Sequence, residues 1–337
     1  MSNKALGATI IAFMLAAAAA STFYAATRDI PSAEPAIPQT KLEKMLSVDP
    51  ATSFTLVVLP DTQRYSKNYP DIFCDQTKWI VENRKDLNIV FVSQLGDIVD
   101  SGGKDPEEWR VASSCLGLLD GIVPYGIIPG NHDTEKASNK ASGFASYDKH
   151  FPVSRYSSYP WYGGSFENYR NNYQIITANG IKFLFLNLEI EPSDKALEWA
   201  KTVVEKNTDA YGIVTTHKFL PDEGNERDKD LKFSTDGNTG EQIWDKLVSK
   251  NCSIRLVLNG HYNWDDGENR ISSKNSCGDR VDQVTQDYQS REIGGNGRLR
   301  VYTFTPSKEK ISVKTYSPYT DTFEEDNDSE FTLPFKR

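Results

Sequence analysis

The sequence has little positive charge and no cluster of basic residues. Its 337 residues contain 38 Lys and Arg against 47 Asp and Glu, which gives a net charge of −9. Because nucleic acids are held mainly by basic patches, this composition argues against nucleic acid as a bulk electrostatic partner. An acidic surface would also repel a polyanionic substrate, so cations within a site would have to attract it. Internal repeats are missing as well, and no Pro- or Ser-rich linker interrupts residues 51–337, so we expect one domain there.

The N-terminal segment lacks charge after its first few residues. A lysine near the start is followed by uncharged residues 5–20, which end in an Ala-x-Ala sequence at Ala20. This is the build of a secretory signal peptide within residues 1–26, cleaved near Ala20, so we expect a secreted, periplasmic or extracellular protein. The alternative is an uncleaved signal-anchor, since residues 5–26 are nearly long enough to span a bilayer; stable membrane contact is expected only in that case. Residues 27–50, rich in Pro, Ala and Ser, predict a flexible tether.

Closely spaced cysteine pairs are also absent. None of the four cysteines lies in a C-x-x-C motif, which argues against a zinc or redox cysteine site. An even number of cysteines in an exported chain predicts disulfides, and four cysteines allow three pairings. Cys74 and Cys115 fall in two helical patterns on either side of one strand, whereas Cys252 and Cys277 flank one loop. We favour the pairs Cys74–Cys115 and Cys252–Cys277.

Five apolar runs stand out because each ends at once in polar side chains. Such runs are typical of buried strands, and ligand sites of open α/β sheets lie at the carboxyl ends of strands. Five endings of this kind in order predict one site built from all of them. They are D-T-Q (residues 61–63), G-D-I-V-D (96–100), G-N-H-D (130–133), His217 and G-H-Y-N (260–263).

The stretches between these runs predict helices and hairpins. Helical periodicity covers residues 72–84 and 107–119, so strand and helix alternate as in α/β proteins. Asn179-Gly180 between two apolar runs indicates a hairpin. Further elements are expected as helices at 197–204 and 242–248 and as antiparallel strands at 298–304 and 311–316.

Two irregular stretches leave their roles open. Residues 134–172 are rich in aromatic side chains, which form either a substrate rim or a long loop packed on its own scaffold. Residues 218–240 are charged and irregular, so we expect a mobile surface loop there.

The ordered series D-x-Q, G-D-x-x-D, G-N-H-D, His and G-H-x-N resembles the calcineurin-like metallophosphoesterases. The resemblance covers residues 53–335 and is to a branch of secreted bacterial and fungal members whose first motif is D-T-Q. It includes PWYGG (160–164), GEQIWDKLV (240–248) and DYQ followed by GGNG (287–297). The resemblance implies a four-layer α/β fold, in which helices flank a two-sheet β-sandwich.

The resemblance also implies two divalent metal ions bridged by Asp97. Asp61, Gln63, Asp97 and Asn263 would hold the first ion, and Asp97, Asn131, His217 and His261 the second. His132 would protonate or orient the leaving oxygen, with Asp100 fixing its ring, since a His–carboxylate pair sets the tautomer. Asp133 would support the loop by hydrogen bonds.

The activity implied by the resemblance is hydrolysis of a small phosphate mono- or diester by a metal-bound hydroxide at the dinuclear centre. Asp100 stands where purple acid phosphatases carry a tyrosine, and Ser101 where Ser/Thr protein phosphatases carry an arginine, so neither class is expected. The alternative is a degenerate relative that binds a phosphorylated ligand or one metal without turnover. Oligomeric state is not predicted.

The sequence departs from the superfamily at one ion only. Gln63 and Asn263 replace histidines, which leaves the first site with oxygen ligands alone. Oxygen ligands favour hard ions, whereas imidazoles suit zinc and iron. Among Mn, Mg, Ca, Zn and Fe, we therefore favour a hard ion at the site of Gln63 and Asn263.

Overall fold

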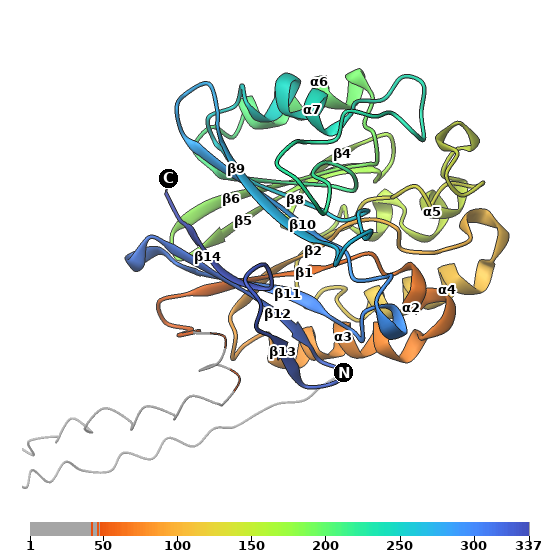
Figure 1. Ribbon diagram of the computed structural model, residues 1–337, viewed down its shortest axis with the longest axis horizontal. Helices are drawn as coiled ribbons and strands as arrows, with labels where there is room; N and C mark the ends of the chain where they lie inside the picture. The colour runs from red at the N-terminus through yellow and green to blue at the C-terminus, as the bar shows by residue number, and fades with distance from the viewer. Residues whose placement is uncertain (1–41, 43–45, 47, 337) are drawn as a thin grey trace, which may run out of the picture. The chain divides into compact units, whose positions relative to one another are not determined.

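The computed structural model describes residues 42, 46 and 48–336 (Figure 1). The chain divides into two units, Met1–Gln39 and Thr40–Arg337, and the described residues all belong to the second. The predicted signal segment, 1–26, lies outside the described residues, as does most of the predicted tether, 27–50. No helix among the described residues is long and apolar enough to cross a membrane. Leu46 and Val48 are buried, so the folded part begins within the range expected to be tether.

The first sheet contains three parallel strands beside antiparallel ones. β1 pairs with β2 and β2 with β3 in parallel, whereas β11 pairs antiparallel with β1 on its other side. β14 pairs with β12. In spatial order the strands are β13 (Thr322–Glu324), β12 (Lys310–Ser317), β11 (Leu299–Thr305), β1 (Phe54–Leu59), β2 (Ile89–Gln94) and β3 (Tyr125–Gly126). Among the strands that the structure describes, the seventh, β14 (Glu330–Pro334), is hydrogen-bonded to β12 only.

The second sheet is built in the same mixed way. β6, β7, β8 and β10 run parallel to one another, and β5 and β6 form the hairpin predicted at Asn179-Gly180. Its order is β4 (Tyr162–Phe166), β5 (Asn171–Ala178), β6 (Ile181–Leu188), β7 (Tyr211–Thr216), β8 (Ile254–Asn259), β10 (Arg280–Gln286) and β9 (Glu268–Lys274).

Alternation along β1 explains how the sheets stack. All six residues of β1 are buried. Phe54, Leu56 and Val58 pack in the core between the sheets, whereas Val57 and Leu59 pack in the core beneath the helices. This period of two is what a strand buried on both faces requires. The predicted fold class, a two-sheet sandwich flanked by helices in four layers, is therefore confirmed (Figure 1).

Helices cover both outer faces. The helices predicted at 72–84, 107–119 and 197–204 are confirmed as α3, α4 and α6, and the segment at 242–248 ends in a π-helical turn, Trp244–Val248. The α-helices are α2 (Gln63–Asn68), α3 (Pro70–Asn83), α4 (Pro106–Gly117), α5 (Ala145–His150), α6 (Asp194–Glu205) and α7 (Gly240–Ile243). Short 3-10 turns lie at Gly102–Lys104, Lys140–Ser142, Val153–Arg155, Glu292–Gly294 and Pro306–Lys308.

The cysteines pair as favoured. One disulfide joins Cys74 of α3 to Cys115 of α4, and the other joins Cys252 to Cys277. The first ties together two helices on the outer face of the first sheet. The second links the start of β8 to the turn between β9 and β10.

The two irregular stretches are packed more tightly than expected. Phe144, Tyr147, Tyr156 and Trp161 are buried in the core beneath the helices, so the packing alternative holds for these aromatic side chains of residues 134–172. The prediction that residues 218–240 form a mobile surface loop is wrong at their start. Phe219 and Leu220 there are fully buried, and the buried amine of Lys218 pairs with Glu191 and Asp228. A buried ion pair of this kind anchors the loop.

Candidate metal centre

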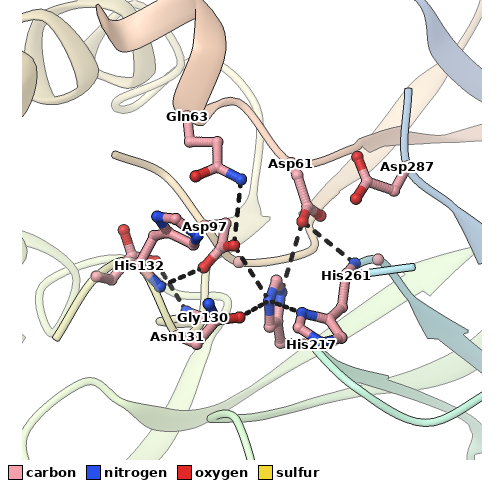
Figure 2. A network of polar contacts seen from close by, with 12 residues as sticks. Asp61, Gln63, Asp97, Gly130, Asn131, His132, His217, His261 and Asp287 are labelled. Atoms are coloured by element: carbon pink, nitrogen blue, oxygen red, sulfur yellow. Dashed lines mark hydrogen bonds and ion pairs between the residues drawn. The ribbon is translucent and has the colours of Figure 1, made fainter. Parts of the chain in front are cut away.

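The predicted site residues meet where parallel strands of both sheets end. β1, β2 and β3 deliver Asp61, Asp97 and Asn131, and β7 and β8 deliver His217 and His261 (Figure 2). Two glycines allow this approach. A side chain at Gly260 would collide with the Asp61 carboxylate, and one at Gly130 would collide with that of Asp97.

His217 shows how the ligand nitrogens are aimed. Its ring is fully buried, and Nδ1 lies 2.8 Å from the Leu95 carbonyl oxygen, to which it donates. Burial opposes the charged form of this ring, but the Asp97 carboxylate outweighs it and raises the His217 pKa; in the neutral ring, which is the form that binds a metal, Nε2 carries the lone pair. It lies 3.1 Å from Oδ1 of Asn131, 3.2 Å from Nδ1 of His261 and 3.4 Å from Oδ2 of Asp97. A metal-binding histidine characteristically donates its other ring N–H in this way.

The atoms around His217 Nε2 fit a cation. One ligand atom each from Asp97, His217 and His261 lies within 4.8 Å of the others. The Asn131 amide nitrogen donates to Ser138 Oγ at 3.2 Å, which leaves its oxygen turned toward Nε2. Burial and then the neighbouring His217 hold the pKa of His261 well below its usual value, so that ring stays neutral and able to bind a metal.

Asp97 lies between the two predicted ion positions. Its Oδ1 accepts a hydrogen bond from the His132 main-chain N–H at 2.7 Å, while Oδ2 lies 3.4 Å from both Gln63 Nε2 and His217 Nε2. Burial opposes ionisation, but the positive charges that His217 and His132 carry when protonated outweigh it and hold the Asp97 pKa below its usual range. The backbone of Asp97 has a φ of 46°, and that of His261 has a φ of 73°. Left-handed backbone in non-glycine residues is strained and concentrates at functional sites.

The first predicted ion position holds buried oxygens without partners. Asp61 Oδ1 and Gln63 Oε1 are both buried and neither has a hydrogen-bond partner. Burial, followed by the Asp287 and Asp97 carboxylates, raises the pKa of Asp61 well above its usual value. Since an unpaired buried acceptor is costly, a cation at this position would remove the cost. The residues present therefore fit a metal ion here as well.

Asn263 is turned away from the other predicted ligands of the first ion. Its amide nitrogen donates to Oδ2 of Asp287 at 2.8 Å, and its oxygen accepts from Ser290 Oγ at 2.6 Å. The structure thus brings Asp61, Gln63 and Asp97 together but places the Asn263 side chain against Asp287.

Asp100 holds the His132 ring by its main chain. Nδ1 of His132 lies 2.7 Å from the Asp100 carbonyl oxygen, whereas the nearest carboxylate oxygen of Asp100 is 3.9 Å from it. That carboxylate pairs instead with Arg64, at 3.2 Å, and with Lys67. The expectation that the Asp100 side chain fixes the ring thus needs correction, because two cations of α2 compete for it. Asp133 has the expected supporting role, since its carboxylate accepts from the N–H groups of Ile98, Val99 and Gly130.

The comparisons with known proteins agree with this geometry. Residues 54–263 match the model of the calcineurin-like phosphoesterase family. The chain belongs to this family. Uncharacterized protein YvnB of Bacillus subtilis (strain 168) is 34% identical over 298 residues, a match that covers 83% of this chain and 21% of that protein. The chain thus spans about a fifth of the length of this curated relative. A solved dimetal phosphatase from Danio rerio is similar in fold, with a TM-score of 0.53 and 13% identity over 84% of this chain and 99% of that one.

This family member has two further residues at the centre that the sequence reasoning missed. Asp287 and Gln289 follow β10 directly, and Gln289 Nε2 lies 2.8 Å from Asp287 Oδ2 and 3.5 Å from Asp61 Oδ2. Burial raises the pKa of Asp287 to about 6, although hydrogen bonds from Asn263 and Gln289 oppose the shift. A signal was present, because Asp287-Tyr288-Gln289 repeats the D-x-Q pattern of residues 61–63.

Restoring an imidazole at position 263 tests the first predicted ion position. We expect Asn263→His to retain about one more equivalent of transition metal per chain after dialysis than the unaltered protein, because imidazole binds such metals better than an amide. The measurement is elemental analysis after dialysis against metal-free buffer. Trp264→His is the matched control, since it adds a histidine one residue further on, at a side chain that is 67% exposed. Equal retention by both variants would contradict the prediction.

Proposed function

We propose that this member of the family is a secreted, metal-dependent hydrolase of small phosphate mono- or diesters, with Asp61, Gln63, Asp97, Asn131, His217 and His261 holding two divalent ions. One observation carries the proposal. His217 Nε2, Asn131 Oδ1, His261 Nδ1 and Asp97 Oδ2 converge on one point, and the other ring nitrogen of His217 is occupied by Leu95. Four electron-donating atoms facing one another are arranged for a cation.

His132 is suited to act on the leaving group. Its side chain is 31% exposed, unlike the fully buried His217, and its Nδ1 is occupied by the Asp100 carbonyl. Nε2 is therefore the ring atom available to give a proton to a departing oxygen. Burial works against the charged form, but Asp97 and the Asp100 carbonyl outweigh it and raise the His132 pKa. A raised pKa keeps the proton available for transfer.

The remaining machinery supports binding and charge neutralisation. When bound, divalent ions would polarise the phosphoryl oxygens and supply an activated water. A cavity of about 560 Å³ adjoins the centre, and Lys140, Lys232 and Phe233 line it. Phe233 connects it to the metal centre, because its ring lies 5.4 Å from that of His261. We propose that this cavity receives the organic part of the ester, since it lies beside the His261 ring and its lining carries both cations, such as Lys232, and carboxylates, such as Glu167.

We propose that the protein is secreted because its cysteines are paired in disulfides. Disulfides persist in oxidising compartments and are rare in the cytosol, and all four cysteines of the sequence are paired.

The second candidate is a relative that binds a phosphorylated ligand or a single ion without turnover. It is favoured by one observation, the replacement of two imidazoles by Gln63 and Asn263. Hydrolysis of an aryl phosphate and an aryl phosphodiester, each with Mn²⁺, Mg²⁺, Ca²⁺ or Zn²⁺, separates the candidates.

Metal removal is the decisive arm of this experiment. We expect turnover with at least one ester and one ion, its loss after chelation, and its return when the ion is restored, because both the charge neutralisation and the activated water depend on the ions. Tight metal binding without turnover of either ester would support the second candidate. Absence of any divalent ion binding would overturn the first candidate and leave only the phosphorylated-ligand form of the second.

A further inference from the structure

The centre contains a second D-x-Q motif that faces the first. Asp61 and Gln63 follow β1 of one sheet, and Asp287 and Gln289 follow β10 of the other. The two motifs touch, because Gln63 Nε2 donates to Gln289 Oε1 and Gln289 Nε2 lies 3.5 Å from Asp61 Oδ2. Figure 2 shows the Asp287 carboxylate beside that of Asp61.

Three carboxylates are buried together at this point. Asp61, Asp97 and Asp287 are each at most 1% exposed. Within residues 48–336, no lysine or arginine forms an ion pair with any of the three, and the basic group that faces them is the His217 ring, 3.4 Å from Asp97 and 4.0 Å from Asp61. Buried charges without enough opposite charge are strongly disfavoured. Asp61 Oδ1 is also buried without a hydrogen-bond partner.

Another buried carboxylate of this protein has basic side chains as partners. Glu268 is also fully buried, but its carboxylate pairs with Arg300 and, at 3.2 Å, with Arg291. Ser329 Oγ and Tyr288 Oη donate to it as well. At this position the protein neutralises an internal carboxylate with two arginines. The three carboxylates near the D-x-Q motifs lack this compensation, which points to a cation supplied from solution.

We propose that Asp287 is an additional ligand of the first ion, and that this site selects Ca²⁺ over Mg²⁺. The inference rests on the proposed dinuclear centre and assigns a residue outside the five motifs. Three carboxylates, each able to bind through one or both oxygens, can supply up to about six of the roughly six to eight oxygens that Ca²⁺ takes. Mg²⁺ instead keeps several of its waters and is bound through one or two carboxylates.

The test is Ca²⁺ affinity in Asp287→Asn, measured by titration calorimetry on chelator-treated protein reloaded with one equivalent of Mn²⁺. We expect the variant to bind Ca²⁺ at least ~10- to 100-fold more weakly, since even outer partners of a ligand change affinity by this much. Without Ca²⁺ the variant should melt at a higher temperature than the unaltered protein, because one of three mutually repelling carboxylates is gone. Its rise in melting temperature with Ca²⁺ should shrink.

Asp282→Asn is the matched control. Asp282 lies on the same strand and is buried, but it pairs with Arg280 and accepts from Ser272 Oγ. We expect this variant to bind Ca²⁺ normally and to melt at a lower temperature, which is the pattern of a structural acid.

A measurement on the unaltered protein covers the case in which Asp287→Asn does not fold. Tb³⁺ can stand in for Ca²⁺, and its luminescence lifetimes in H₂O and D₂O count bound waters. We expect fewer than about three, because protein oxygens fill most positions. Five or more waters, unchanged Ca²⁺ affinity in Asp287→Asn, or tighter binding of Mg²⁺ than Ca²⁺ would overturn the inference while leaving the phosphoesterase proposal intact. Failure of the unaltered protein to bind any divalent ion would overturn the phosphoesterase proposal itself.

Discussion

Asp97→Asn is expected to lower ester hydrolysis at least ~100-fold while leaving the fold unchanged. Asp97 is the residue that lies between both ion positions, with Oδ2 3.4 Å from Gln63 Nε2 and from His217 Nε2. An amide offers only one neutral oxygen, so both ions lose their shared negative ligand. The amide oxygen can still accept from the His132 N–H, as Oδ1 does at 2.7 Å. The structural contact is therefore kept.

Turnover at saturating metal, metal content and melting temperature should be measured together. The expected pattern is loss of activity and of metal with a melting temperature, in the presence of chelator, close to that of the unaltered protein. Retention of more than about a tenth of the activity at saturating metal would contradict the bridging role. The control Asp282→Asn should keep both metal and activity.

His132→Ala is expected to slow turnover by roughly 10²- to 10⁴-fold without loss of metal, the range for a general acid. The side chain does not face His217 Nε2, and its Nδ1 is occupied by Asp100, so its removal leaves the ligand atoms in place. The loss should be largest for esters with poor leaving groups, because these depend most on proton donation.

His150→Ala is the matched control for this variant. His150 belongs to none of the five motifs, and its ring stacks on Trp109 at 5.8 Å, away from the ligand cluster. It should retain nearly full turnover. If elemental analysis shows that His132→Ala loses metal together with activity, His132 is a ligand and the proposed role is wrong.

The sequence predicted most of the centre because its strands are apolar. β1, β2, β7 and β8 read as continuous apolar runs, so each polar residue after them was conspicuous. Parallel pairing then carries such residues to one edge. Both disulfides and the hairpin at Asn179-Gly180 followed from equally local patterns.

Asp287 was missed because β10 does not read as a buried strand. Its sequence, RVDQVTQ, places polar side chains inside the protein, among them Asp282, Gln283 and Gln286. Their partners come from distant segments, such as the Val58 carbonyl that accepts from Gln286. The role of Asp100 was misjudged for a similar reason. Arg64 and Lys67 lie on a helix that begins at Gln63, and only the folded chain shows that they take up its carboxylate.

The division of the metal centre between two sheets bears on how long the native state lasts. Asp61, Asp97 and Asn131 come from the first sheet, and His217 and His261 from the second. The second ion position draws its ligands from both sheets, so an ion can fill it only after the sheets have docked. Contacts absent from the folding transition state slow unfolding without speeding folding. Bound ions would therefore slow unfolding. The lifetime of the native protein, which governs its survival among proteases, would then depend on the concentration of metal ions in its surroundings.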